Sequence, residues 1–340
     1  MQKGFDTKKY VELQSKEILK RLTGSISRSY FEIGGKLGAD MHASRVLPGY
    51  EPDAKLQVLA KISKKMELVY CISAIDLERQ KHYPDTGLTY NKQLFKDLEL
   101  LEKRGLDIRC VAITIYNKEK KADELMIELK KRGIDYYVFN RIENYPNDLK
   151  LILSDKGFGK EPEIEFDEHL IGITGPGGGS GKFGICMTQL YHDYKKGNYT
   201  RYAKNETFPV WDLPIDHAVN LSYEAATADL GDENMIDLYY KKKYGKDSVN
   251  YNRDIENFAI MKELLSKLAP KAVKWCSSPT EMGINMVAKA ITSDALVSSA
   301  AEQEIIRRYK EYQKEHKEGM ASPETVARAK QIMEKAGLSS

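Results

Sequence analysis

Apolar positions in the first half of the chain alternate between two spacings. Short continuous apolar runs, such as residues 68–75 and 108–115, have the length of buried strands. Between such runs, residues such as Leu94, Leu98 and Leu101 recur at helical spacing, and the helical stretches end in basic residues followed by glycine. Strands that are apolar on both faces and alternate with helices indicate a mostly parallel sheet flanked by helices, which is an α/β fold.

The same patterns predict the order of elements. Strands are expected at residues 29–33, 68–75, 108–115, 134–139 and 169–174. Helices are expected near residues 7–23, 53–62, 94–103, 122–131 and 183–194, from residue 279 with a buried stripe through residue 291, and from residue 323.

A polar stretch at residues 154–168, with two glycines and a proline, predicts a domain boundary. Residues 1–155 are expected to form a Rossmann-like α/β domain, with a leading helix in residues 1–24. Residues 165–340 are expected to form a P-loop-like α/β domain with helices in its C-terminal portion.

The sequence GPGGGSGK, at residues 175–182, lies between an apolar run and a helical pattern. Glycines allow backbone N–H groups to converge on a phosphate, and the positive end of the following helix attracts the same anion. A lysine at the end of the turn supplies a cation for a β- or γ-phosphate. The residues predicted to bind a phosphorylated cofactor here are Gly175, Gly177, Gly179, Ser180, Gly181 and Lys182.

This turn departs from the standard loop G-x-x-x-x-G-K-[ST] at two positions. Pro176 occupies the first glycine position, and Phe183 stands where a hydroxyl would contact Mg²⁺. The strand–turn–helix context favours phosphate binding. The alternative is a glycine turn that only allows a helix to pack close to a strand.

A second glycine turn follows the strand predicted at residues 29–33. Gly34, Gly35 and Lys36 form this turn and are a second candidate phosphate site, because open α/β sheets place ligands beyond the carboxyl ends of their strands. His42 and Arg45 come shortly after and are candidate catalytic residues that would contact a second substrate. A solvated loop with ordinary turn residues is the alternative.

Residues 206–237 combine many polar and aromatic side chains. If residues 220–229 are helical, a polar stripe on this helix could line a cleft. Glu224 and Asp229 are then candidate catalytic residues, and Glu224, Asp229 and Asp232 are candidate Mg²⁺ ligands, because this cation prefers carboxylate oxygens. The alternative is a solvent-exposed helix face.

The composition is that of an ordinary globular chain, with 41% hydrophobic and 30% charged residues among 340. A formal net charge of +3 gives no overall field that would attract nucleic acid or an anionic membrane. The expected partner is therefore a phosphorylated small molecule. A homo-oligomer is compatible with a sheet covered by apolar helices.

Three features predict a cytoplasmic protein. The N-terminal residues are charged and helical, unlike a signal peptide. No apolar run approaches the ~20 residues that span a bilayer. The four cysteines show neither metal-ligand nor redox spacing.

Several long blocks, among them EIGGK, HASRVLPGYEPD, ITGPGGGSGK, ETFPVWDLP, NLSYEAATADL and SPTEMGINMV, resemble the bacterial family called domain of unknown function 1846, or uncharacterised protein family 0371. The resemblance runs from about residue 5 to residue 340. It implies a cytoplasmic bacterial protein with a nucleotide-binding-like α/β core, and it carries no catalytic role over to these residues. Members of the family extend beyond the end of this chain, which implies either a fragment or a naturally short relative; if a C-terminal domain normally completes the site, the site here is incomplete. The family turn P-G-x-G-S-G-K is matched from Pro176 to Lys182.

These observations leave three hypotheses for function. The first is an enzyme that binds ATP or another nucleotide with Mg²⁺ at the turn of residues 175–182 and catalyses phosphoryl transfer or ATP-dependent ligation. The second is a non-catalytic module that senses a phosphorylated metabolite. The third is an enzyme that acts on a phosphorylated substrate without a nucleotide.

Overall fold

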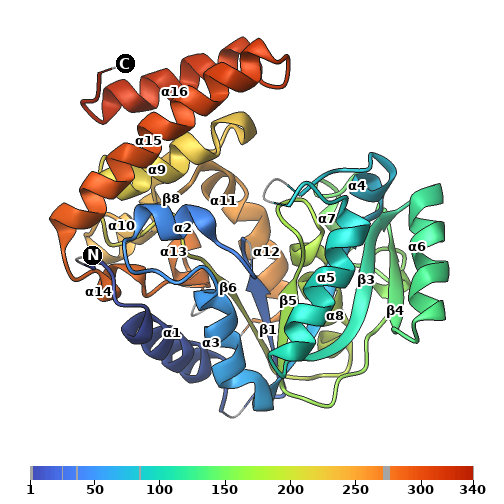
Figure 1. Cartoon of the computed structure of the whole chain (residues 1–340). Coiled ribbons are helices and arrows are strands. Elements are labelled where there is room, and N and C mark those ends of the chain that lie inside the picture. The colour runs from blue at the N-terminus through green and yellow to red at the C-terminus, as the bar shows by residue number, and fades with distance from the viewer. Residues whose placement is uncertain (1–2, 25, 36, 84–85, 271–275, 340) are drawn as a thin grey trace.

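The computed structural model of the chain, drawn in Figure 1, describes residues 3–24, 26–35, 37–83, 86–270 and 276–339. Its centre is a seven-stranded sheet in which every pairing is parallel. Across the sheet the order is β4-β3-β2-β5-β1-β6-β9. The strands are β1 (Arg28–Ile33), β2 (Met66–Ser73), β3 (Asp107–Tyr116), β4 (Tyr136–Asn140), β5 (Leu170–Thr174), β6 (Thr200–Asn205) and β9 (Gly283–Ile284).

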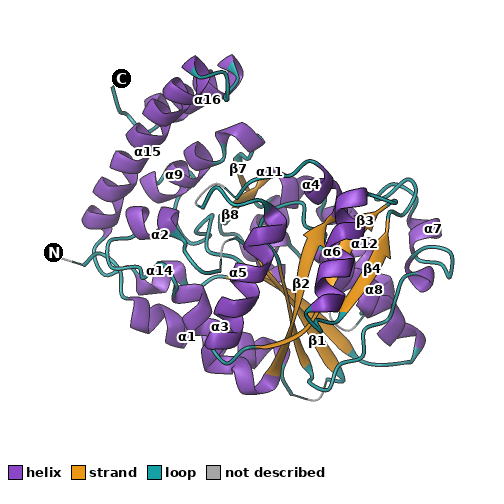
Figure 2. Cartoon of the chain, turned by 45° about the vertical axis from the view of Figure 1, so that its right-hand side comes forward, coloured by secondary structure: helices purple, strands orange, loops and turns teal. Residues whose placement is uncertain are grey.

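Helices cover both faces of this sheet, as Figure 2 shows with strands in orange. Successive strand residues point to opposite faces, so Phe31 joins one hydrophobic cluster and Tyr30 the other. The first face is covered by α1 (Thr7–Leu22), α3 (Ala54–Ile62), α5 (Tyr90–Lys103) and α6 (Lys120–Lys131). The second is covered by α7 (Leu149–Ile152), α8 (Lys182–Lys195) and α12 (Phe258–Leu268). The predicted α/β fold, with a parallel sheet flanked by helices, is confirmed.

A group of helices forms a third hydrophobic cluster beside the sheet. Here α9 (Ala218–Ala226) packs against α15 (Asp294–Lys317) and α16 (Pro323–Lys335), at the upper left of Figure 1. The short helix α2 (Met41–Val46) contacts α15 and α9, and so connects this layer to the chain that leaves β1. The other elements are α4 (Ala74–Glu78), α10 (Leu238–Tyr244), α11 (Asn252–Glu256), α13 (Pro279–Met282), α14 (Val287–Ala290), the 3-10 turns η1 (Ser63–Lys65), η2 (Phe158–Lys160) and η3 (Ala228–Leu230), and the antiparallel pair β7 (Asn234–Ile236) and β8 (Val249–Tyr251).

The strands of the two predicted domains share one sheet. β5 comes from the second predicted domain, yet it lies between β1 and β2 of the first and pairs in parallel with both. The polar stretch before β5 therefore does not separate two sheets. Sequence patterns locate strands along the chain, but they do not show which strands become neighbours in the sheet. The insertion of β5 between β1 and β2 was therefore not predicted.

The prediction of a helix that continues from residue 279 to residue 291 is wrong. α13 ends at Met282, and the next two residues form the edge strand β9, which pairs with β6. The backbone at Gly283 lies against the indole of Trp211, where a Cβ would be 2.2 Å from the ring. The apolar residues that recur at helical spacing in this stretch thus belong to a strand and to a separate short helix, α14. Among the helices that the structure describes, none combines the length and the apolar character needed to cross a bilayer.

The strand order makes a prediction about fragments. A fragment of residues 1–155 lacks β5 and β6, which are the two pairing partners of β1. We expect this fragment to show no cooperative unfolding transition in urea, whereas the 340-residue chain unfolds cooperatively. Circular dichroism during urea titration measures both. A sharp transition of the fragment would contradict this prediction and would show that residues 1–155 fold as an independent unit.

Candidate functional site

The first predicted glycine turn lies at the carboxyl edge of the sheet, between β5 and α8. Two of its glycines are in the left-handed region, Gly179 at φ +78° and Gly181 at φ +82°. A Cβ on Gly181 would be 2.6 Å from Thr114 Oγ1, and one on Gly175 would be 2.5 Å from the Cys71 carbonyl oxygen. Close packing therefore explains the glycines at the two ends of the turn.

Packing does not explain the middle of the turn. A Cβ on Gly178 would meet no atom within 4 Å, and the backbone there has no positive φ. A side chain at this position would instead project into the open space above the turn. An unobstructed backbone is what a phosphate needs in order to reach converging N–H groups.

Lys182 is folded over the same turn. Its ammonium donates hydrogen bonds to the Gly177 carbonyl oxygen at 2.8 Å and to Ser180 Oγ at 3.2 Å. The residue is only 7% exposed, and no carboxylate of the described residues pairs with it. A buried ammonium whose acceptors are all neutral carries an uncompensated positive charge.

A cavity of about 450 Å³ opens beside the turn. Its walls include Lys182, the carboxyl ends of β3 and β4, and Glu32 of β1. Two guanidinium groups also line it. Arg253 forms an ion pair with Asp232 at 2.6 Å, whereas the exposed side chain of Arg141 makes no ion pair with any residue that the structure describes.

The second predicted turn is crowded by charged side chains. A Cβ on Gly34 would lie 2.8 Å from Glu206 Oε2, and one on Gly35 would lie 2.7 Å from Lys55 Nζ. Lys55 is buried and forms an ion pair with Asp40 at 2.9 Å. Lys36 lies outside the described residues. This turn therefore surrounds an ion pair, and it does not line the cavity at the first turn.

His42 and Arg45 face the helical layer and do not line the cavity. Arg45 donates two hydrogen bonds to the buried carboxylate of Glu304 on α15, at 2.8 and 3.0 Å, and His42 Nδ1 lies 3.3 Å from it. Arg307 contacts the same carboxylate at 2.6 Å. These contacts attach α2 to α15, and the pair is not brought to the glycine turn of residues 175–182.

The three predicted Mg²⁺ ligands have separate partners. Glu224 accepts a hydrogen bond from the Asn234 backbone N–H at 3.2 Å, Asp229 accepts one from Tyr312 at 2.8 Å, and Asp232 pairs with Arg253. Across the described ranges, no group of three or more His, Cys, Asp or Glu side chains is arranged to hold a metal ion. The helix considered for residues 220–229 ends at Ala226, and Asp229 lies in the 3-10 turn η3 that follows, so the three carboxylates do not share one helix.

Sequence reasoning missed a row of ionisable residues on β1 and β6. Glu32 and Lys204 are partners in register, and Lys204 pairs with Asp254 at 2.9 Å. The half-buried Glu206 follows one residue beyond the end of β6. Burial raises the pKa of Glu206 to about 7, with Asp254 and Glu32 acting in the same direction and Lys204 against it. The alternation of Tyr202, Lys204 and Glu206 was the available signal, but β6 has too few apolar residues to be recognised as a strand.

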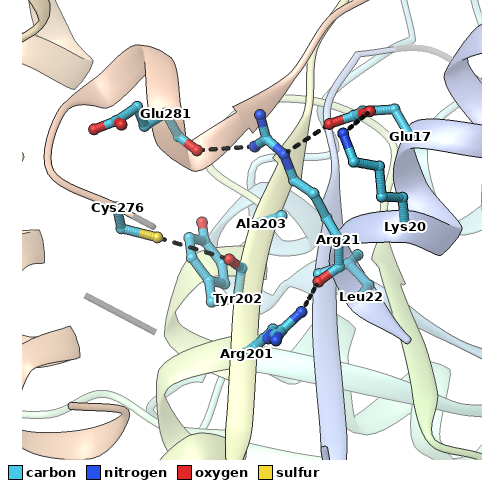
Figure 3. A pocket seen from close by; sticks show the side chains of 9 residues that line it. All are labelled: Glu17, Lys20, Arg21, Leu22, Arg201, Tyr202, Ala203, Cys276 and Glu281. Carbon is cyan, nitrogen blue, oxygen red and sulfur yellow. Dashed lines mark hydrogen bonds and ion pairs between the residues drawn. The ribbon is translucent and has the colours of Figure 1, made fainter. Parts of the chain in front are cut away.

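A second cavity, of about 230 Å³, lies toward the other end of β6 (Figure 3). In this cavity the Arg21 guanidinium donates a hydrogen bond to the Glu281 carbonyl oxygen at 2.9 Å, which Figure 3 draws. The same guanidinium donates to the Gly283 carbonyl oxygen at 2.6 Å. Arg201 in turn donates to the Arg21 carbonyl oxygen at 2.6 Å. These bonds hold the end of α1 against β9. The cavity therefore lies at the packing interface between α1 and the edge of the sheet.

The comparisons with known proteins agree with the blocks quoted above. The family model described as "Domain of unknown function DUF1846, N-terminal" matches residues 3–337. The chain belongs to this family. It is 43% identical over 338 residues to a UPF0371 protein of Clostridium botulinum (strain Kyoto / Type A2), covering 99% of this chain and 67% of that protein. A UPF0371 protein of Fusobacterium nucleatum is 44% identical over 338 residues, with 99% and 66% covered. The chain thus spans about two thirds of the length of these DUF1846 relatives.

Glu206 is expected to make the stability of this DUF1846 chain depend on pH. Its folded-state pKa of about 7 lies above the ordinary value of 4.5, so the folded state binds more protons between these values. The free energy of unfolding therefore falls as pH rises through this window. Between pH 5 and pH 8, the free energy of unfolding should therefore fall by roughly 2–3 kcal/mol less in Glu206→Gln than in wild type, as measured by urea unfolding. An unchanged pH dependence in the variant would contradict the assignment.

Glu304 should act in the opposite sense. Burial alone would raise the pKa of this carboxyl, but hydrogen bonds from Arg307, His42 and Arg45 hold it well below its usual range. The stabilisation is therefore present above the ordinary pKa of 4.5 and is lost as pH falls below it. Glu304→Gln should lower the free energy of unfolding at pH 7 by about 1–3 kcal/mol, because the guanidinium partners are partly exposed.

The control for this variant is Glu302→Gln on the same helix, which removes a carboxylate outside the Glu304 cluster. The difference in free energy of unfolding between wild type and Glu304→Gln should become smaller below pH 4.5. The free energy of unfolding of Glu302→Gln should stay near the wild-type value at every pH. Equal effects of the two substitutions would exclude a specific role for the Glu304 cluster.

Proposed function

We propose that this protein binds a phosphorylated small molecule, such as a nucleotide, in the cavity beside the glycine turn. The observation that carries this proposal is the buried ammonium of Lys182, whose hydrogen-bond acceptors among the described residues are a carbonyl and a hydroxyl. Burying a cation without a counter-ion is costly, and an anionic ligand would offset that cost.

The surroundings of Lys182 support the same ligand. The open backbone at Gly178 and the first N–H groups of α8 provide hydrogen-bond donors for phosphate oxygens. Arg141 and Arg253 at the cavity wall add cations that pair well with phosphate. The cavity volume lies within the range of small-molecule sites, which is roughly 300–1,000 Å³.

Phosphoryl transfer or ATP-dependent ligation is one use of such a site, and it would require Mg²⁺ positioned on the nucleotide. A second candidate is binding or conversion of a phosphorylated ligand without a metal. It is favoured by Phe183, which follows Lys182 and packs its ring against Tyr202 with 5.9 Å between centroids. The position that carries the Mg²⁺-binding hydroxyl in standard loops is thus part of the hydrophobic packing.

Isothermal titration calorimetry with ATP, GTP and inorganic pyrophosphate, each with and without Mg²⁺, tests the proposal. Lys182→Met keeps much of the side-chain volume but removes the charge, and it should weaken binding about 10- to 100-fold because charge-assisted hydrogen bonds are lost. The matched control is Lys196→Ala, which removes an exposed lysine just past the other end of α8.

Circular dichroism of each variant checks that the fold is retained. Unchanged affinity in Lys182→Met, or the absence of binding by all three probes, would contradict the proposal. If binding needs Mg²⁺, the nucleotide-dependent enzyme is favoured over the metal-independent candidate. If Mg²⁺ has no effect on affinity, the metal-independent candidate is favoured.

A further inference from the structure

The row of ionisable residues on β1 and β6 lies on the same face of the sheet as α8. Tyr30 and Tyr202 belong to the hydrophobic cluster under α8, and side chains two residues further along each strand point the same way. Glu32 and Lys204 are those next residues, and they are register partners. Continuing the alternation past the end of β6 brings the chain to Glu206, whose carboxylate lies over Gly34.

This row is connected to the cavity at the glycine turn. Phe183, the residue after Lys182, packs against Tyr202, and the Tyr202 hydroxyl donates to Glu32 Oε2 at 2.8 Å. Glu32 itself lines the cavity. Arg253 also lines it, and the adjacent Asp254 holds Lys204. The row therefore begins at the wall of the proposed phosphate site and leads away from the glycine turn.

Glu206 differs from the other carboxylates of this region. Glu32 is bound by Tyr202 and Asp254 by Lys204, whereas no described residue donates a hydrogen bond or forms an ion pair with the Glu206 carboxylate. The side chain is half-buried, and its backbone is fixed because its N–H donates to the Ile284 carbonyl oxygen at 3.2 Å. Among the described residues, none competes for this carboxylate, so a ligand that reaches it can donate a hydrogen bond to it.

The charges around Glu206 indicate which donor fits. Glu32 and Asp254 lie within electrostatic reach and would repel a second phosphate or a carboxylate of the ligand. Lys204 and Lys55 already supply positive charge to the same place, which disfavours an additional ammonium. A neutral hydroxyl is repelled neither by the two carboxylates nor by the two lysines. The raised pKa of Glu206 agrees, because a carboxyl group that is partly protonated near neutral pH can both accept a hydrogen bond from a hydroxyl and donate one to it.

We propose that Glu206 binds a hydroxyl group of the ligand whose phosphate lies at the glycine turn, so that the ligand is a phosphorylated sugar or a nucleotide with its sugar hydroxyls. This inference rests on the proposed phosphate site and adds the class of the group attached to the phosphate. Gly34 is required in this arrangement, because a Cβ there would displace the carboxylate.

The test compares ligands with and without hydroxyl groups. Calorimetric titrations use glucose 6-phosphate, ribose 5-phosphate and ATP as hydroxyl-bearing probes, and inorganic pyrophosphate as the probe that contains only the anionic part. Glu206→Met should weaken binding of at least one hydroxyl-bearing probe about 10- to 100-fold and leave pyrophosphate affinity unchanged. Glu206→Gln, which retains an acceptor, should lie between wild type and Glu206→Met.

Two controls separate this inference from the phosphate site itself. Lys182→Met should weaken all four probes, including pyrophosphate, whereas Glu99→Met, at an exposed position on α5, should weaken none. If Glu206→Met weakens pyrophosphate as much as the sugar phosphates, or weakens none of the probes, the hydroxyl assignment is wrong while the phosphate site stands. If Lys182→Met has no effect on any probe, the phosphate site fails, and the inference fails with it.

Thermal unfolding of each variant verifies that reduced binding does not reflect loss of the fold. Amine-bearing phosphates provide the last comparison. If glucosamine 6-phosphate binds more tightly than glucose 6-phosphate, and Glu206→Met abolishes this difference, then Glu206 binds an ammonium group of the ligand. That result would overturn the proposal.

Discussion

β5 pairs in parallel with β1 on one side and with β2 on the other, and it is the strand that joins the two parts of the main sheet. Every other feature of the candidate site depends on this placement. The chain that leaves β5 emerges at the middle of the carboxyl edge, between the ends of β1 and β2, and β3 lies next beyond β2. The glycine turn therefore packs against Cys71 and Thr114 of the strands on one side and opens toward Glu32 on the other. A turn after an edge strand would have no such walls.

Local parts of this arrangement could be predicted from the sequence. β2 is buried at all eight positions and β5 at all five, so both appear as continuous apolar runs, and the turn after β5 is recognisable from its glycines and lysine. β6 and β9 were missed. β6 carries Arg201, Lys204 and Asn205 among its six residues, and β9 has only two residues. Such strands are specified by their neighbours in space and have no clear signal of their own.

The same distinction explains the outcome for the site residues. Lys182 and its glycines are contiguous, so their cooperation is visible in the sequence. His42 and Arg45 also form a pair of functional groups, but their partner Glu304 is about 260 positions away, and only the packing of α2 on α15 shows that the three are engaged with one another. Glu206 presents the reverse case. It looks like an ordinary surface glutamate, and its half-buried position over Gly34 follows from a parallel pairing between β1 and β6.

The separation between paired strands also has a consequence for synthesis of the protein. Ser29 of β1 pairs with Leu170 of β5, and the nearest alternative partner strand, β6, comes later still. At a translation rate of about 5–20 residues per second, β5 leaves the ribosome roughly 7–30 seconds after β1. During this interval β2 and β3 can already pair, while the apolar strand β1 has no partner. A nascent chain of this protein therefore exposes a strand to which chaperones can bind, and folding of the glycine turn must await completion of the central sheet.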